Sequence, residues 1–124
     1  MEWKTICDTS EVGTGKSKEF EISGKKILVS NMDGKFYAID ALCSHMGGDL
    51  GKGKIEGNDV ICPKHHAKFD VKTGKVDKNI NGFVKAITRK EAKGLSSYEV
   101  KEDEGKLSIN IFISYFYLVS FEMS

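Results

Sequence analysis

Proline and cysteine are both scarce in this chain of 124 residues, which contains one proline and three cysteines. Three cysteines cannot pair completely, so the sequence excludes a disulfide framework and favours a reducing, cytoplasmic setting. The longest apolar run, Ile111–Phe121, is too short to span a bilayer as a helix, which needs about 20 residues. The first residues lack a basic start followed by an apolar core, so we expect neither a signal peptide nor a transmembrane segment.

An excess of charge of one sign is also missing, because 19 Lys and Arg face 18 Asp and Glu. This balance, without a recognisable binding motif, argues against a nucleic-acid partner. Positive charge is nevertheless concentrated in residues 43–90, which hold ten basic and five acidic side chains. The local excess favours an acidic protein partner, and the alternative is that the lysines only cover a solvated face.

The chain consists of short β-strand patterns separated by turns that contain glycine. Strands are predicted in seven segments: residues 20–22, 26–30, 35–39, 59–62, 67–71, 98–101 and 106–109. Asp33-Gly34 suits a tight hairpin, since both residues tolerate positive φ, and a last hairpin is predicted around Asp103-Glu104-Gly105. A helical turn is expected only at Glu11–Thr14 or Arg89–Gly94. The pattern predicts one all-β domain, residues 1–124, built as a sandwich or a barrel, with Cys7 and Trp3 in its core.

Two segments combine cysteine and histidine at short spacing. Cys43-Ser44-His45 offers one thiolate and one imidazole, and Cys62-Pro63-Lys64-His65 offers another such pair. Because each segment carries both ligand types, each can reach both metals of a binuclear centre. The alternative is a structural zinc site, although zinc sites usually separate paired ligands by at least two residues. Four glycines lie beyond the first pair, where they would let the backbone approach a metal cluster: Gly47, Gly48, Gly51 and Gly53.

These boxes resemble those of Rieske [2Fe-2S] proteins, and Phe36–Asp40 resembles the strand that leads into such boxes. The second box, Cys62–Asp70, is similar to that of soluble Rieske ferredoxins. The resemblance implies one [2Fe-2S] cluster, with Cys43 and Cys62 on one iron and His45 and His65 on the other. It also implies stacked antiparallel sheets or a partial barrel. A small cluster-binding subdomain would cover about residues 41–79, and an apolar C-terminal extension residues 110–124.

Departures from the respiratory Rieske pattern predict a low-potential, ferredoxin-like class. Gly48 and Lys64 occupy positions where respiratory members carry a second pair of cysteines, so the disulfide of those members cannot form. Ala67 and Phe69 replace a serine and a tyrosine whose hydroxyl groups donate hydrogen bonds to the cluster. His66 stands where many members have a small residue; it is interpreted as a surface or packed histidine, with a ligand or proton-partner role as the alternative.

The function implied by the resemblance is electron transfer rather than catalysis. A soluble one-electron carrier would pass electrons between a reductase and a terminal oxygenase or other acceptor. The alternative is a small Rieske subunit of a larger oxidoreductase complex. Residues Ile111–Phe121 would be apolar on both faces of a strand, so they are a candidate dimer or partner contact.

Overall fold

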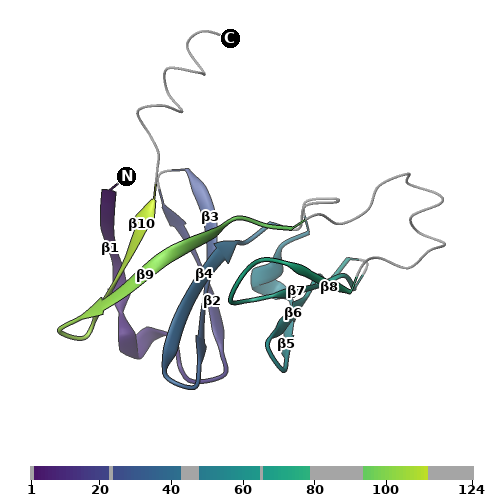
Figure 1. The fold of residues 1–124 in the computed structure, drawn as a ribbon, viewed down its shortest axis with the longest axis horizontal. Helices are drawn as coiled ribbons and strands as arrows, with labels where there is room; N and C mark the ends of the chain where they lie inside the picture. The colour runs from purple at the N-terminus through teal and green to yellow at the C-terminus, as the bar shows by residue number, and fades with distance from the viewer. Residues whose placement is uncertain (1, 23, 43–47, 65, 79–93, 112–124) are drawn as a thin grey trace, which may run out of the picture.

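The computed structural model describes residues 2–22, 24–42, 48–64, 66–78 and 94–111, and these form two antiparallel sheets (Figure 1). The large sheet has the strand order β1-β10-β9-β4-β3-β2. Its strands are β1 (Glu2–Asp8), β2 (Ser17–Ile22), β3 (Lys25–Met32), β4 (Lys35–Asp40), β9 (Ser97–Asp103) and β10 (Lys106–Ile111). The small sheet has the order β5-β6-β7-β8. Its strands are β5 (Lys54–Glu56), β6 (Asp59–Ile61), β7 (Lys68–Asp70) and β8 (Val76–Lys78).

The large sheet curls toward closure. Its edge strands β1 and β2 approach each other: residues 4–6 of β1 and 20–22 of β2 line the same cavity of about 290 Å³. The small sheet lies beside the large one (Figure 1). The predicted all-β class, with stacked sheets and a partial barrel, is therefore confirmed.

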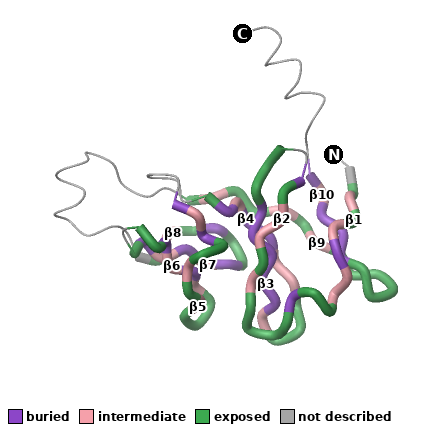
Figure 2. The backbone as a smooth tube through the Cα atoms, turned by 180° about the vertical axis from the view of Figure 1, so that it is seen from behind, coloured by how far each residue is buried: buried purple, intermediate pink, exposed green. Residues whose placement is uncertain are grey.

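Tight turns set the register of the hairpins. Asp33 and Gly34 have φ values of 56° and 88°, and Glu104 and Gly105 have 51° and 75°. Two consecutive residues with positive φ match the right-handed twist of the flanking strands, which makes a two-residue connection possible. Both predicted hairpins are confirmed, and the hairpin tips are exposed to solvent (Figure 2).

Buried side chains form two apolar cores, which share β3 and β4. The barrel core, inside the large sheet, consists of Cys7, Val12, Ile22, Ile27, Val29, Ala38, Leu107, Ile109 and Ile111. The inter-sheet core, between the two sheets, consists of Leu28, Ile39, Ala41, Leu50, Val60, Cys62, Ala67, Phe69 and Val71. Alternate residues of β3 point into different cores, which explains the continuous apolar run of Ile27, Leu28 and Val29.

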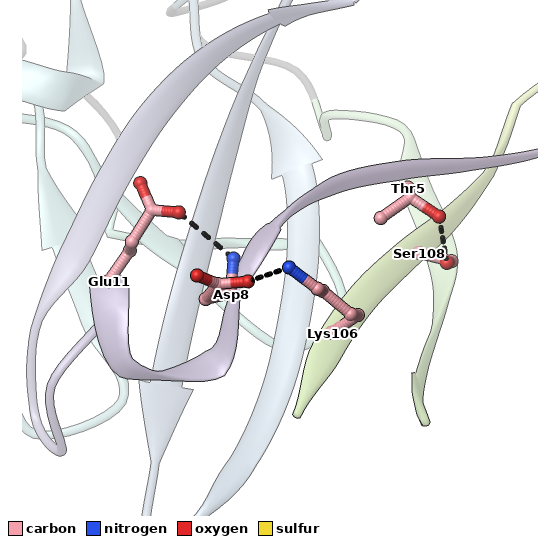
Figure 3. A network of polar contacts seen from close by, with 5 residues as sticks. All are labelled: Thr5, Asp8, Glu11, Lys106 and Ser108. Atoms are coloured by element: carbon pink, nitrogen blue, oxygen red, sulfur yellow. Dashed lines mark hydrogen bonds and ion pairs between the residues drawn. The ribbon is translucent and has the colours of Figure 1, made fainter. Parts of the chain in front are cut away.

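Polar contacts fasten β1 to β10 (Figure 3). The hydroxyls of Thr5 and Ser108 are hydrogen-bonded at 3.2 Å across the strand pair. Lys106 pairs with Asp8, and the Asp8 backbone N–H donates to the Glu11 carboxylate at 2.9 Å. That backbone hydrogen bond lowers the pKa of Glu11, and the Asp8 carboxylate raises the pKa of Lys106.

Local details of the sequence prediction need correction. The helical turns are the 3₁₀ segments η1 (Thr9–Glu11) and η2 (Leu50–Lys52), so the first lies earlier than expected and the second was not predicted. Residues 89–93 of the other expected turn lie outside the described residues. Cys7 packs in the barrel core as predicted, and burial raises the pKa of its thiol. The prediction for Trp3 is wrong, because it is 43 % exposed and the Lys101 ammonium lies 4.8 Å from its ring centre.

Candidate metal centre

The second ligand box occupies the loop between β6 and β7. Cys62 immediately follows β6 and is fully buried in the inter-sheet core. Its N–H donates to the Ala67 carbonyl at 2.8 Å, and its own carbonyl accepts from the His66 N–H at 2.9 Å. These two hydrogen bonds close a short loop over residues 62–67. The other predicted ligands, Cys43, His45 and His65, lie outside the described residues.

His66 has a backbone conformation that favours glycine. Its φ is 64°, in the left-handed region, and its side chain is exposed. The conformation gives a physical reason for a small residue at this position. The exposed side chain agrees with the interpretation of His66 as a surface histidine.

The described residues on either side of the first ligand box are bridged to each other. Leu42 and Asp49 form an isolated antiparallel bridge, and the Leu50 N–H donates to the Ala41 carbonyl at 2.8 Å. The Asp49 carboxylate then accepts from the Gly51 N–H at 2.9 Å, which caps η2. The two segments that flank the first box therefore lie next to each other.

The residues that flank the two boxes meet in one apolar core. Ala41 and Leu50 flank the first box, while Cys62 and Ala67 bound the second loop, and all four belong to the inter-sheet core. Segments about twenty residues apart in sequence are thus packed together. This convergence was inferred from the sequence only through the resemblance to a known family.

The side chains that pack with Cys62 in the inter-sheet core are apolar. Ala67 and Phe69 are both fully buried, and neither carries a hydroxyl group. A thiolate at Cys62 therefore receives no hydroxyl hydrogen bond from these two positions, although its loop is closed by backbone hydrogen bonds.

Two of the predicted backbone-approach glycines have another role. A methyl group at Gly53 would collide with the Ile61 carbonyl, and one at Gly51 would collide with the Glu19 carboxylate. These glycines thus allow close packing of protein against protein. Gly48 is buried, and Gly47 lies outside the described residues.

The Asp40 carboxylate joins the end of β4 to the start of β9, where the chain leaves and re-enters the large sheet. Asp40, at the end of β4, accepts hydrogen bonds from the Tyr98 hydroxyl at 2.5 Å and from the Ser96 N–H at 3.3 Å. The Asp40 N–H also donates to the Ser96 carbonyl at 3.0 Å. Burial and the hydrogen bond to Asp40 raise the pKa of Tyr98. No local sequence pattern indicates this contact, because Asp40 and Tyr98 are 58 residues apart.

Two pairs of acidic residues lie close to the ligand loops. Glu19 and Asp49 share a hydrogen bond that raises the pKa of Glu19 and lowers the pKa of Asp49. Asp59 of β6 is partly buried, and burial followed by the hydrogen bond with Asp77 raises its pKa to about 6. These pairs were also not predicted from the sequence.

The donor set suits the implied iron–sulfur cluster. Two thiols and two imidazoles match the ligand chemistry of a cluster in which His₂ replaces Cys₂ on one iron. The buried Cys62 and its closed loop supply one preorganised donor. Among the residues with a described position, no group of three or more His, Cys, Asp and Glu forms another candidate metal site.

The described part of the chain contains no helix long and apolar enough to cross a membrane.

Comparisons with known proteins agree with the donor set and the fold. Residues 2–87 match the sequence profile of the Rieske [2Fe-2S] domain. Sulredoxin from Sulfurisphaera tokodaii is 32% identical over 111 residues, which cover 90% of this chain and 100% of that protein. The ferredoxin component of the naphthalene 1,2-dioxygenase system of Pseudomonas putida is 26% identical, with 90% and 97% of the two chains covered.

A solved structure shows the same fold. The ferredoxin of carbazole 1,9a-dioxygenase from Nocardioides aromaticivorans IC177 superposes with a TM-score of 0.76 at 21% identity. The alignment covers 90% of this chain and 100% of that ferredoxin. With the profile match over most of its length, this chain belongs to the Rieske [2Fe-2S] domain family.

Proposed function

We propose that this chain is a one-electron carrier that holds a [2Fe-2S] cluster on Cys43, Cys62, His45 and His65. The observation that carries the proposal is the convergence of the flanks of both boxes in the inter-sheet core. Residues 41–79 act as the cluster-binding subdomain within one domain, and the large sheet serves as its rigid support. The bound cluster supplies a site that accepts and releases one electron.

The surrounding residues hold the ligand loops and keep water away from the buried side. The backbone hydrogen bonds of residues 62–67 fix the position of the Cys62 sulfur, and the bridge between Leu42 and Asp49 fixes the start of the other loop. Ala67 and Phe69 offer no hydroxyl donor to stabilise additional negative charge. We therefore assign the protein a reduction potential in the lower part of the Rieske range, which as a whole spans about −150 to +300 mV.

The partners follow from the relatives. Ferredoxin components of dioxygenase systems are similar over nearly the whole of this chain, and one similar solved structure is a complex of a reduced oxygenase and an oxidized ferredoxin. We assign this chain a reductase as electron donor and an oxygenase or other redox protein as acceptor. We assign the chain to the cytoplasm, in keeping with an odd and small number of cysteines, which argues against a disulfide framework.

The test is anaerobic purification followed by metal analysis and EPR spectroscopy. The expected sample is coloured, contains two irons and two sulfides, and takes up one electron from dithionite to give a rhombic signal. A colourless sample that holds zinc and stays EPR-silent would contradict the proposal. Co-purification with a larger enzyme in fixed stoichiometry would replace the free carrier with a subunit of an oxidoreductase complex.

A further inference from the structure

Three side chains from different strands form a row of hydrogen bonds beside the end of β4, where β9 begins (Figure 1). The Lys25 ammonium at the start of β3 donates to the Tyr98 hydroxyl at 3.3 Å and lies 5.7 Å from the centre of the tyrosine ring. The Tyr98 hydroxyl donates to Oδ1 of Asp40 at 2.5 Å, and the Ser96 N–H donates to Oδ2 at 3.3 Å. Both oxygens of the Asp40 carboxylate are therefore held by residues at the start of β9.

Backbone hydrogen bonds fix the place of Asp40 next to the first ligand box. Its N–H donates to the Ser96 carbonyl at 3.0 Å, and the N–H of the following Ala41 donates to the Lys26 carbonyl at 2.9 Å. Ala41 is itself fully buried in the inter-sheet core. Cys43 is three residues beyond Asp40, so at most about 11 Å of extended chain separates their Cα atoms. That span is close to one Debye length, about 10 Å at 0.1 M salt, so the proposed ligand lies within reach of the carboxylate's charge.

Tyr98 determines how much of the Asp40 charge acts on its surroundings. A hydroxyl that donates to a carboxylate disperses part of the negative charge. Both side chains are partly buried, so solvent screens the remaining charge less than it would at an exposed site. Burial and the hydrogen bond to Asp40 also raise the pKa of Tyr98, which keeps its hydroxyl protonated and able to donate. Reduction adds one negative charge to the proposed metal centre, and a nearby carboxylate opposes that addition.

We infer that Asp40 is a charged group that lowers the reduction potential of the metal centre, and that Tyr98 is the positioning residue that limits this effect. The inference rests on the proposed function and names a regulation of the same site. It adds to the absence of hydroxyl donors at Ala67 and Phe69, because the Asp40 carboxylate acts from the side of the first ligand box. Asp40→Asn and Tyr98→Phe both alter the same hydrogen bond, yet they should shift the potential in opposite directions.

The experiment is a redox titration of the cluster-loaded protein at low ionic strength. Dithionite delivers one electron per protein through dye mediators and is itself oxidised to sulfite, while the visible absorption is recorded against the solution potential. Asp40→Asn removes a negative charge and should favour reduction roughly threefold, which corresponds to a potential about 28 mV higher. Tyr98→Phe leaves that charge with one donor fewer and should disfavour reduction roughly twofold, which corresponds to a potential about 18 mV lower.

The double variant shows whether Tyr98 acts through Asp40. With a neutral side chain at position 40, the Tyr98 hydroxyl has no charge to disperse. In the Asp40→Asn background, Tyr98→Phe should therefore change the reduction equilibrium by less than roughly 1.3-fold. Added salt should shrink the shifts of both single variants, because it screens the charge. Iron content and urea unfolding establish that each variant is folded and loaded.

Two control variants match the chemistry of these changes. Tyr37→Phe removes a phenol hydroxyl from β4 itself, at a residue whose ring centre lies 5.6 Å from the Lys72 ammonium. Asp33→Asn removes an exposed carboxylate from the turn before β4, at the end of that strand opposite to Asp40. Each control should change the reduction equilibrium by less than roughly 1.3-fold.

The signs of the shifts decide the outcome. Shifts of the same sign for Asp40→Asn and Tyr98→Phe, or an undiminished effect of Tyr98→Phe in the double variant, would overturn the inference. A loaded protein whose potential stays unchanged in both single variants would refute the inference and leave the proposed function intact. A parent protein without the cluster would refute the proposed function itself.

Discussion

The two sheets of this protein differ in the length of their strands. Strands of the large sheet have six to eight residues and pair over long registers, such as the six pairs between β2 and β3. Every strand of the small sheet has three residues. Three rows of pairing place few side chains in contact, so the small sheet depends on its loops, on the inter-sheet core and on the proposed metal ligands.

The shared strands β3 and β4 explain how one sheet supports the other. Ile27 and Val29 point into the barrel core, while Leu28 and Ile39 point into the inter-sheet core. The small sheet therefore rests on strands that are already held from their other side. The difference suggests that the large sheet persists when the small one is damaged, and the following changes test that asymmetry.

Loss of the proposed ligand Cys62 should have the largest effect. Cys62→Ala is expected to abolish iron binding and to open the small sheet, because the proposed cluster would link the two ligand boxes. Hydrogen exchange should speed up in β6 and β7 and remain slow in β3 and β10. Cys7→Ala is the control, since Cys7 lies in the barrel core, and it should retain the iron. Retention of a full iron content by Cys62→Ala would contradict the ligand assignment.

Truncation of Phe69 should be the next most damaging change. Phe69 is fully buried at the centre of the small sheet, and Phe69→Ala should lower the free energy of unfolding by about 3–5 kcal/mol. Ile109→Ala in the barrel core should cost about 2–5 kcal/mol. Urea unfolding measures both losses. Only Phe69→Ala should release the iron at low urea; equal release from both variants would show that the sheets unfold as one unit.

Substitution of Gly74 tests the contact between the turn after β7 and the segment that leads into β9. It has φ of 80°, and an added methyl group would collide with the Leu95 backbone carbonyl. Gly74→Ala should therefore cost about 3 kcal/mol. Gly105 has a φ of 75° with open space around it, so Gly105→Ala should cost only about 1 kcal/mol. Similar midpoints for the two variants in thermal unfolding would argue against the steric account.

Asp59 should give the smallest effect, which depends on pH. Its pKa is raised from 3.8 to about 6, so the folded protein holds the proton more tightly than the unfolded chain does. The resulting stabilisation is fully present below about pH 4 and is lost as the pH rises through 6. Asp59→Asn should be more stable than the parent at pH 8 by on the order of 1 kcal/mol, after allowance for solvent screening.

The control for this pH effect is Asp103→Asn, because Asp103 is exposed at the end of β9 in the large sheet. Its unfolding curves should follow those of the parent at each pH. If Asp59→Asn instead loses stability equally at pH 4 and pH 8, its carboxyl group acts as a hydrogen-bond partner rather than as a crowded charge.

Local signals in the sequence predicted much of the large sheet. The Asp33-Gly34 turn fixed one hairpin, and the alternation of residues 106–109 located β10. Strands β1, β5 and β8 were missed. Three residues carry too little periodicity for β5 and β8 to be recognised, and β1 has an irregularity between Thr5 and Cys7 that disturbs its alternation. Trp3 was misplaced since hydrophobicity alone does not say which face of an edge strand is covered.

The sequence indicated candidate ligands for the site but not the residues that support the ligand loops. Cysteine and histidine spacing identified the boxes, and the domain match agrees with the family they indicate. Two hydrogen bonds, one from Tyr98 to Asp40 and one between Glu19 and Asp49, join residues that are far apart in the chain. Such contacts depend on the folded arrangement of the sheets, and no local pattern reports them.

Pulsed EPR of the dithionite-reduced protein would test the central claim most directly. Two directly coordinated ¹⁴N nuclei should couple to the reduced centre, and both couplings should persist in His66→Ala. His65→Ala should lose the native signal, while Lys35→Glu should keep it. A reduced centre without nitrogen coupling, or couplings that vanish in His66→Ala and survive in His65→Ala, would contradict the proposed ligands.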